Sequence, residues 1–363
     1  MKFSKMLRRR VNLRMAFHVF FFLGLIGLTF WFVFKDQDLG ELFHVLTSVD
    51  SFYVLLGLGF MFFYFVMESY NVKSVLKSLG DKKISLLKSL KFTSIGYFFS
   101  AITPAATGGQ PVEIYYMTKE GIKGANATLA LLIQLCGFQI STLTFGLVSA
   151  LLNPGLLKDG LVFFFLLGFA INGFALGLML VCIFSKKLTE RLSNFIMRVL
   201  KKFKVKNLEV KKSKLEKSIT QYQESSLFVK EHPFEFVKSI IRVFVQIACY
   251  YAIPICVYKS FGLNSYSILS LFAMQAVLYT MVSGLPLPGA IGVSETIFLS
   301  IFGLAFGESL VSGAMLLSRI ISFYFFVVVS LLVVVVNAIK KQSVQGEIDK
   351  TVLEIEKAIE ENA

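Results

Sequence analysis

The sequence predicts an all-α polytopic membrane protein, in which about six full spans and two broken, re-entrant helical hairpins form an inverted repeat. Composition is the first reason: apolar residues make up 55% of the 363 residues and charged residues 17%, against about 25% charged residues in soluble domains. Several stretches also reach the ~20 apolar residues that cross a bilayer. Two further apolar stretches are broken by Pro and Gly at matching positions, which predicts the hairpins.

The charge pattern argues against a nucleic-acid partner. The net charge is +14, but the basic residues occur in blocks between apolar spans, which is the positive-inside pattern and suits anionic lipid head groups. The cysteines show no CxxC spacing and the histidines are far apart, so neither a metal nor another cofactor is expected. These residues are Cys136, Cys182, Cys249 and Cys256, and His18, His44 and His232.

The first membrane half covers residues 15–184. Residues 1–14 are basic and are expected in the cytoplasm, so the first span, 15–34, leads outward. Its apolar run is too long for a typical signal peptide, and it is expected to be retained. The loop 35–50 is mostly acidic, which suits the outside, and the second span, 52–70, returns to lysines on the inside.

A first hairpin is predicted near 92–118. The apolar stretch breaks at Thr103-Pro-Ala-Ala-Thr-Gly-Gly-Gln-Pro111, and both of its flanks carry lysines. Because a segment with two inside flanks enters and leaves on the same side, we expect it to be re-entrant from the cytoplasm. Spans 125–152 and 161–184 follow, leading outward and back.

A basic cytoplasmic loop, 185–238, joins the two halves. It holds 14 Lys and Arg against 6 Glu, and is expected to lie as one or two helices on the anionic lipids of the inner leaflet. The acidic tail, 339–363, carries apolar residues at helical spacing. It is expected to be either a solvated helix or a helix docked on the basic loop.

The second membrane half, 239–338, repeats the unit in the opposite sense. A span near 240–258 leads outward, and a second hairpin is predicted near 266–306, broken at Leu285-Pro-Leu-Pro-Gly-Ala-Ile-Gly292. Its flanks lack a basic cluster, so it is entered from outside. Its legs are also long enough for two full spans, which would leave the later topology unchanged. The last span, 312–336, returns inside, so both termini are expected in the cytoplasm.

The two breaks predict an internal polar cavity. Proline removes a backbone donor and glycine admits unusual φ angles, and exposed backbone is tolerated in a membrane only beside protein or a wet cavity. The helices after the breaks point N–H groups and a positive dipole end at that cavity, which suits a lipid phosphate. The candidate lipid-binding residues here are Pro104, Thr107, Gly108, Gly109 and Gln110, and Pro286, Pro288, Gly289, Gly292 and Ser294.

Three charged residues complete the candidate site. Glu113 and Glu295 each stand nine residues after the first proline of a break, and a carboxylate inside a span is costly and usually paired or functional. Each could instead cap the helix that it begins. Arg319 lies too deep in the last span to reach the interface easily. It is expected to pair with one of these glutamates or to bind a lipid phosphate.

Other polar residues in the spans are expected to be structural. Glu68 lies near an inner boundary, where it is expected to be solvated. Gly173 and Gly177 form a GxxxG motif, which is weak evidence for a homo-oligomer. Four glutamines are expected in hydrogen bonds between helices: Gln134, Gln139, Gln246 and Gln275.

The two broken segments resemble those of the lysylphosphatidylglycerol synthase/flippase transmembrane family. The matching residues are Thr103-Pro-Ala-Ala-Thr-Gly-Gly-Gln-Pro-Val-Glu113 and Leu285-Pro-Leu-Pro-Gly-Ala-Ile-Gly-Val-Ser-Glu295, followed by Arg319, and the resemblance covers about residues 10–340. It implies a multi-pass inner-membrane protein. The membrane region of that family moves an aminoacylated lipid to the outer leaflet and contributes to resistance to cationic peptides.

Three hypotheses follow for the function. The first is a flippase that moves a phospholipid, such as lysylphosphatidylglycerol, or a glycolipid between leaflets. The second, implied by the family name, is a phosphatidylglycerol lysyltransferase, in which two carboxylates could act as acid and base. However, no nucleophile–base motif is present, and after Val336 only a short acidic tail follows, so neither a catalytic residue nor a synthase domain is expected. The third is a partner subunit of a separate synthase.

Overall fold

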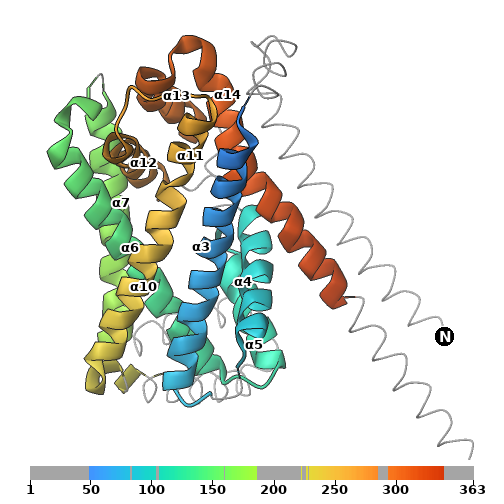
Figure 1. The fold of residues 1–363 in the computed structure, drawn as a ribbon. Helices are drawn as coiled ribbons and strands as arrows, with labels where there is room; N and C mark the ends of the chain where they lie inside the picture. Colours follow the sequence, from blue (N-terminus) through green and yellow to red (C-terminus); the bar gives the residue numbers. More distant parts are fainter. Residues whose placement is uncertain are drawn as a thin grey trace, which may run out of the picture.

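The chain folds into a bundle of helices (Figure 1). The computed structural model describes residues 49–81, 84–103, 106–158, 160–185, 222, 226–227, 229–284 and 293–338, and all regular structure within them is helical. The helices are α3 (Ser51–Ser78), α4 (Leu86–Ala101), α5 (Gly109–Lys119), α6 (Gly124–Leu152), α7 (Leu161–Phe184), α10 (Pro233–Tyr251), α11 (Ile253–Ser260), α12 (Ile268–Val282), α13 (Val293–Phe306) and α14 (Glu308–Arg319), with a 3-10 turn, η2 (Pro154–Leu156), and a π turn, η4 (Ile320–Tyr324).

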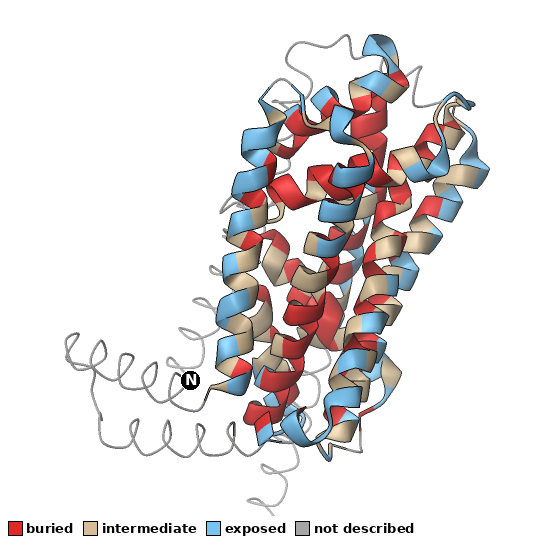
Figure 2. Cartoon of the chain, turned by 90° about the vertical axis from the view of Figure 1, so that its left-hand side faces the viewer, coloured by how far each residue is buried: buried red, intermediate tan, exposed pale blue. Residues whose placement is uncertain are grey.

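Five helices in the described part are long and apolar enough to cross a membrane. They are α3, α6, α7, the α10–α11 pair (Pro233–Ser260) and the last helix (Glu308–Ala338), and they confirm the predicted all-α polytopic class. Their outward faces expose large apolar side chains, while buried residues line the inside of the bundle (Figure 2). The predicted first span, 15–34, lies outside the described residues. α3 also continues to Ser78, beyond residue 70, where the second span was predicted to end.

The first hairpin is the pair α4 and α5. At 1.5 Å per residue these helices are about 24 and 17 Å long, short of the ~30 Å hydrocarbon core. Their outer ends meet, because Glu120 just after α5 forms ion pairs with Lys88 (3.4 Å) and Lys91 near the start of α4. Burial alone would raise the pKa of the Glu120 carboxyl, but hydrogen bonds and charge from the two lysines lower it overall. The hairpin therefore enters and leaves at one end of the bundle, as predicted.

The second hairpin is the pair α12 and α13, with 15 and 14 residues. Both of its outer ends lie beside α11, since the Tyr258 ring packs on Tyr266 before α12 and on Phe306 at the end of α13 (centroids 6.4 and 5.4 Å apart). Within the described residues, each leg is shorter than the ~20 residues of a full span. α11 ends next to the start of α3, where Asp50 N donates to Ser260 O (2.9 Å). The two hairpins thus open at opposite ends of the bundle (Figure 1).

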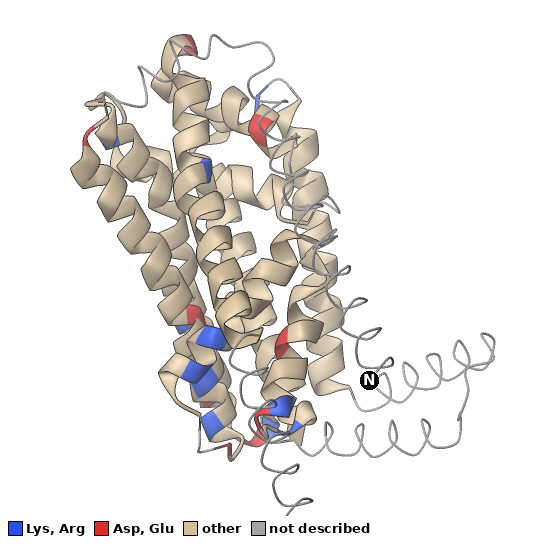
Figure 3. Cartoon of the chain, turned by 90° about the vertical axis from the view of Figure 1, so that its right-hand side faces the viewer, with Lys and Arg blue, Asp and Glu red and all other residues tan. Residues whose placement is uncertain are grey.

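One end of the bundle is rich in lysine (Figure 3). At this lysine-rich end α3 and α5 finish and α4, α6 and α10 begin. The first hairpin opens here, and the second opens at the opposite end. The lysines are Lys73, Lys77, Lys88, Lys91, Lys119, Lys123 and Lys238.

A polar network ties α3, α6 and α10 together near the lysine-rich end. Gln134 Nε2 donates to Gln246 Oε1 (2.7 Å), and Asn71 Nδ2 donates to Gln134 Oε1 and to Ser239 Oγ (2.9 Å). Gln246 Nε2 donates in turn to Glu68 Oε2 (3.1 Å). The structure confirms the predicted interhelix bonds of Gln134 and Gln246. The expectation of a merely solvated Glu68 was wrong, because α3 turns that side chain toward α10.

Replacing Gln134 with Leu is expected to lower the free energy of unfolding by about 1–2 kcal/mol, because the buried amides of Asn71 and Gln246 each lose one of their hydrogen bonds. Gln139 on the same helix is a matched control, since its Oε1 is buried with no hydrogen-bond partner among the described residues. Gln139→Leu should be neutral or stabilising. Thermal unfolding of the purified variants in detergent measures both, and equal effects would contradict a structural role for the network.

Candidate functional site

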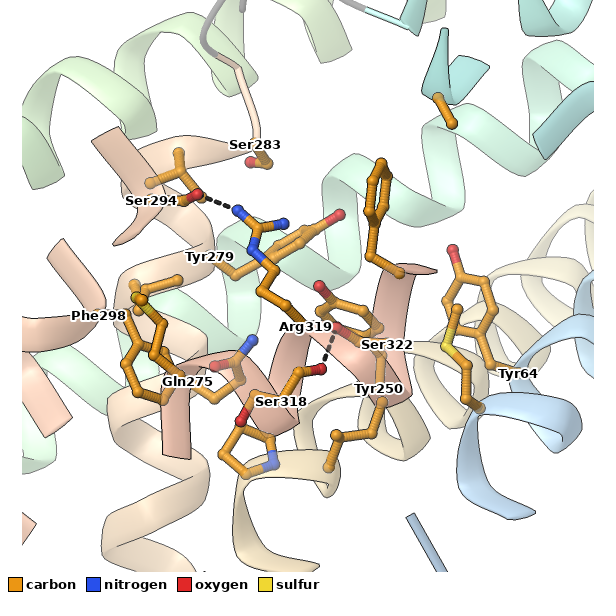
Figure 4. Close-up of a pocket in the computed structure, with 18 of the residues that line it drawn as sticks. Tyr64, Tyr250, Gln275, Tyr279, Ser283, Ser294, Phe298, Ser318, Arg319 and Ser322 are labelled. Carbon is orange, nitrogen blue, oxygen red and sulfur yellow. Dashed lines mark hydrogen bonds between the residues drawn. The ribbon is translucent and has the colours of Figure 1, made fainter. Parts of the chain in front are cut away.

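A cavity of about 330 Å³ lies between the two hairpins (Figure 4). A volume of this size falls at the small end of the range for small-molecule sites. Its walls come from α3, α4, α10, α11, α12, α13 and the helix that begins with α14. Polar side chains project into it from most of these elements: Tyr64, Tyr97, Ser100, Tyr250, Gln275, Tyr279, Ser283, Ser294, Ser318, Arg319 and Ser322.

Arg319 is the charged residue at the centre of this cavity. Its Nη2 lies 2.8 Å from Glu295 Oε1, and it also donates to Ser294 Oγ. Ser294 Oγ donates to Glu295 Oε2 (3.0 Å), so the three side chains form a closed polar cluster. The Glu295 side chain is 2% exposed and that of Arg319 is 19% exposed. The guanidinium therefore remains accessible from the cavity while its partner is buried behind it.

The helix that carries Arg319 changes its winding at this point. α14 ends at Arg319, and the next five residues, Ile320–Tyr324, form the π turn. Such wide turns are rare and are frequent at functional sites. The turn brings Ser322 and Phe323 into the cavity wall beside Ser318 and Arg319, and the Arg319 guanidinium lies 5.9 Å from the Phe323 ring centroid.

The tip of the first hairpin closes the cavity on another side. Ser100 and Ala106 line it, while Thr107 and Gln110 are not among its lining residues. Gly108 and Gly109 instead allow close packing: a Cβ on Gly109 would lie 1.9 Å from Ser100 Oγ and 2.7 Å from Gly96 O. The backbone N–H of Gly108, just before α5, is already bonded, since it donates to Thr103 Oγ1 (2.9 Å).

The two predicted glutamates occupy different environments. Glu295 lies in the first turn of α13 and pairs with Arg319, which combines the dipole role and the ion pair considered from the sequence. Glu113 is the fifth residue of α5, outside its first turn, so it does not cap that helix. It is 5% exposed, and it packs against Gly96 of α4, where a Cβ would lie 2.7 Å from its Oε2. Of the two glutamates, Arg319 therefore pairs with Glu295 and not with Glu113.

Comparison with known proteins agrees with this architecture. The model of the family described as the lysylphosphatidylglycerol synthase TM region matches residues 17–330. The chain belongs to this family. A UPF0104 membrane protein of Archaeoglobus fulgidus is 23% identical over 242 residues, which cover 64% of this chain and 70% of that protein. The family and the apolar helices together make the chain a multi-pass membrane protein.

Sequence reasoning missed the tyrosines of this family member's cavity. Tyr64, Tyr250 and Tyr279 pack ring against ring, with centroids 5.9 Å apart for the first two and 5.2 Å for the last two. Tyr97 Oη donates to Ser322 O (3.1 Å) and so ties α4 to the π turn. In the sequence, a tyrosine in an apolar span is usually interpreted as a core residue. The only sequence feature that could have indicated the cavity was the polar hydroxyl of these tyrosines, in spans that otherwise contain many phenylalanines.

Several predicted site residues of this family member lie outside the described residues. These are Pro104, Pro286, Pro288, Gly289 and Gly292, together with most of the basic loop 185–238 and the tail 339–363. In the part of the chain that is described, no cluster of His, Cys, Asp or Glu could hold a metal ion. Gly173 and Gly177 face open space, because a Cβ at either would meet nothing within 4 Å.

Proposed function

We propose that this protein moves a phospholipid between the two leaflets of the cell membrane. The observation that carries the proposal is a partly buried arginine, Arg319, which faces a cavity between two hairpins of opposite sense. Charged residues inside membrane proteins usually mark substrate pathways. Broken helices in inverted halves, with a site where they meet, are the architecture of many transporters.

The chemistry of the cavity suits a phosphate with a polar head group. Arg319 can give charge-assisted hydrogen bonds to phosphate oxygens, and the hydroxyls of Tyr250 and Tyr279 can donate to the remaining ones. The Glu295 carboxylate lies behind the guanidinium and would favour a cationic amine nearby. A phospholipid that carries both charges, such as lysylphosphatidylglycerol, fits this pair of residues, and the family description names the enzyme class that makes it.

The proposed orientation follows from the lysines. Loops rich in Lys and Arg stay in the cytoplasm, so the lysine-rich end is placed on the cytoplasmic side. The first hairpin then opens inward and the second outward, and the cavity would be reached from one leaflet at a time. The basic loop 185–238 is proposed to rest on the anionic lipids of the inner leaflet.

A reconstitution experiment tests this function. Vesicles are prepared with phosphatidylglycerol that carries a fluorophore on one acyl chain, and a membrane-impermeant reductant bleaches the label in the outer leaflet. Protein-containing vesicles should lose the label from both leaflets, and vesicles without protein only from the outer one. A competing arm with unlabelled lysylphosphatidylglycerol should slow the loss more than the same amount of phosphatidylglycerol. Bleaching equal to that of protein-free vesicles would contradict the proposal.

A further inference from the structure

Two carboxyl groups lie between the cavity and the lysine-rich end, and the proposed lipid site uses neither. We propose that Glu68 and Glu113 form a proton-binding pair that couples movement of the lipid to the proton gradient across the membrane. The coupling rests on the proposed function, whereas the binding of the proton does not. Glu68 belongs to α3 and Glu113 to the first hairpin, so the pair joins a full span to a re-entrant element.

Glu113 is buried without the partner that a charged carboxylate needs. Its Oε1 has no hydrogen-bond partner among the described residues, and no Lys or Arg of that part of the chain forms an ion pair with it. On the other side its Oε2 rests on Gly96, which has no side chain to donate a hydrogen bond. An ionised carboxylate in these surroundings is costly. The neutral, protonated form fits this site.

Glu68 is held by an amide and not by a cation. Gln246 Nε2 donates to its Oε2 (3.1 Å), and no ion pair joins it to a described basic residue. The nearest arginine of the network, Arg242, donates instead to Asn71 Oδ1 (3.4 Å). Arg319 pairs instead with Glu295. Among the described residues, the ionisable groups that interact electrostatically with Glu68 are Glu113 and the hydroxyls of Tyr64 and Tyr97.

The two carboxyl groups interact through their charges, since Glu68 acts electrostatically on Glu113. Two like charges in a medium of low polarity repel each other, which favours a state of the pair that retains a proton. Binding takes one proton from water onto a carboxylate oxygen, and release returns the same proton to water. No other reactant is needed, and the pair returns to its starting state after each cycle.

The position of the pair connects the proton to the cavity. Tyr64 lies one turn before Glu68 on α3, and Tyr97 follows Gly96, against which Glu113 packs. Both tyrosines line the cavity. On the other side, the chain of Gln246, Gln134, Asn71 and Ser239 leads from Glu68 toward the lysine-rich end. A change of charge on Glu113 would thus act on the hairpin that forms one wall of the lipid site.

Infrared spectroscopy tests the proton without any lipid transport. The purified full-length protein in detergent is titrated, and the carbonyl band of protonated carboxyl groups is followed. At neutral pH the wild type should show this band, and Glu113→Gln or Glu68→Gln should remove it or move its midpoint to another pH. The control is Glu120→Gln, which removes an exposed carboxylate from the end of the same helix and should leave the band unchanged. A spectrum without a protonated carboxyl band at neutral pH overturns the proposal.

A second experiment tests the coupling in vesicles with labelled phosphatidylglycerol. A gradient of one pH unit, at zero membrane potential, should shift the steady-state ratio of label between the leaflets about tenfold when one proton moves per lipid. Wild type and Glu120→Gln should both show this shift, and Glu113→Gln should give a ratio near one. A wild-type ratio that ignores the gradient, with transport intact, overturns the coupling. Absence of transport in the wild type refutes the proposed lipid function instead, and the infrared result then still decides the proton site.

Discussion

Replacing Arg319 with Gln is expected to reduce lipid translocation by about 10- to 100-fold, because a charge-assisted hydrogen bond contributes about 1.5–3 kcal/mol. The same change leaves the carboxylate of Glu295, 2% exposed, without its cation. Removal of one partner from a buried ion pair typically costs about 3–5 kcal/mol of stability. The single variant is therefore expected to lose both activity and stability, and the fluorescence assay with labelled phosphatidylglycerol measures the first.

A double variant separates the two losses. In Arg319→Gln combined with Glu295→Gln no buried charge is left unpaired, so the midpoint of thermal unfolding in detergent should return close to that of the wild type. Translocation should stay low, because the cation that holds the phosphate is still absent. Arg242→Gln removes an arginine outside the cavity lining and serves as the control. A double variant that regains wild-type translocation would show that Arg319 only holds the helices together.

Replacing Gly168 with Ala is expected to lower the free energy of unfolding by about 3 kcal/mol, at the upper end of the usual range for overpacking. A Cβ at this position of α7 would lie 2.2 Å from Thr280 O and 2.8 Å from Met281 Cα. These are backbone atoms of α12, so no side chain can rotate away to make room. The two helices would have to separate, which would also break the bond from Asn172 Nδ2 to Thr280 O (3.3 Å).

The matched control for this prediction is Gly173→Ala on the same helix. A Cβ there would meet nothing within 4 Å, and alanine favours a helix over glycine by about 0.5–1 kcal/mol. Gly173→Ala should thus leave the thermal midpoint unchanged or raise it. Because α12 also carries Gln275 and Tyr279 into the cavity, Gly168→Ala should slow translocation as well. Equal midpoints for the two alanine variants would contradict the close packing of α7 on α12.

The hairpins could be predicted from the sequence because their cause is local. Clusters of proline and glycine stop a helix, and the presence or absence of lysines beside each stretch indicates which end it faces. The hairpins and their opposite openings were foreseen in this way, whereas the legs of the second hairpin were judged long enough for two full spans, and its break, 285–292, lies outside the described residues. The pairing of Arg319 with Glu295, and not with Glu113, was not foreseen, since it depends on how α13 and α14 pack. Both glutamates stand at matching positions in the sequence, yet only the three-dimensional arrangement separates them.

Glu68 shows most clearly what the sequence could not reveal. Near the end of an apolar span a glutamate is usually solvated, and its neighbours in the sequence gave no other indication. Its hydrogen-bond partner, Gln246, belongs to a helix on the far side of a long basic loop. The cavity tyrosines were missed for a related reason, because a Tyr and a Phe pack alike until the position of the hydroxyl is known.

The π turn after Arg319 sets the rotational phase of the last helix. One extra residue in a turn rotates everything that follows by about 100° relative to an uninterrupted α-helix. Just before the turn in the sequence, Arg319 faces Glu295 of α13. After the turn, Phe326 stacks on Phe65 of α3 with ring centroids 4.9 Å apart, and Val327 packs with Phe98 of α4. The last helix can contact both sets of partners only with this rotation. The one extra residue in the π turn therefore couples the position of the Arg319 charge in the cavity to the packing of the last helix against the first hairpin.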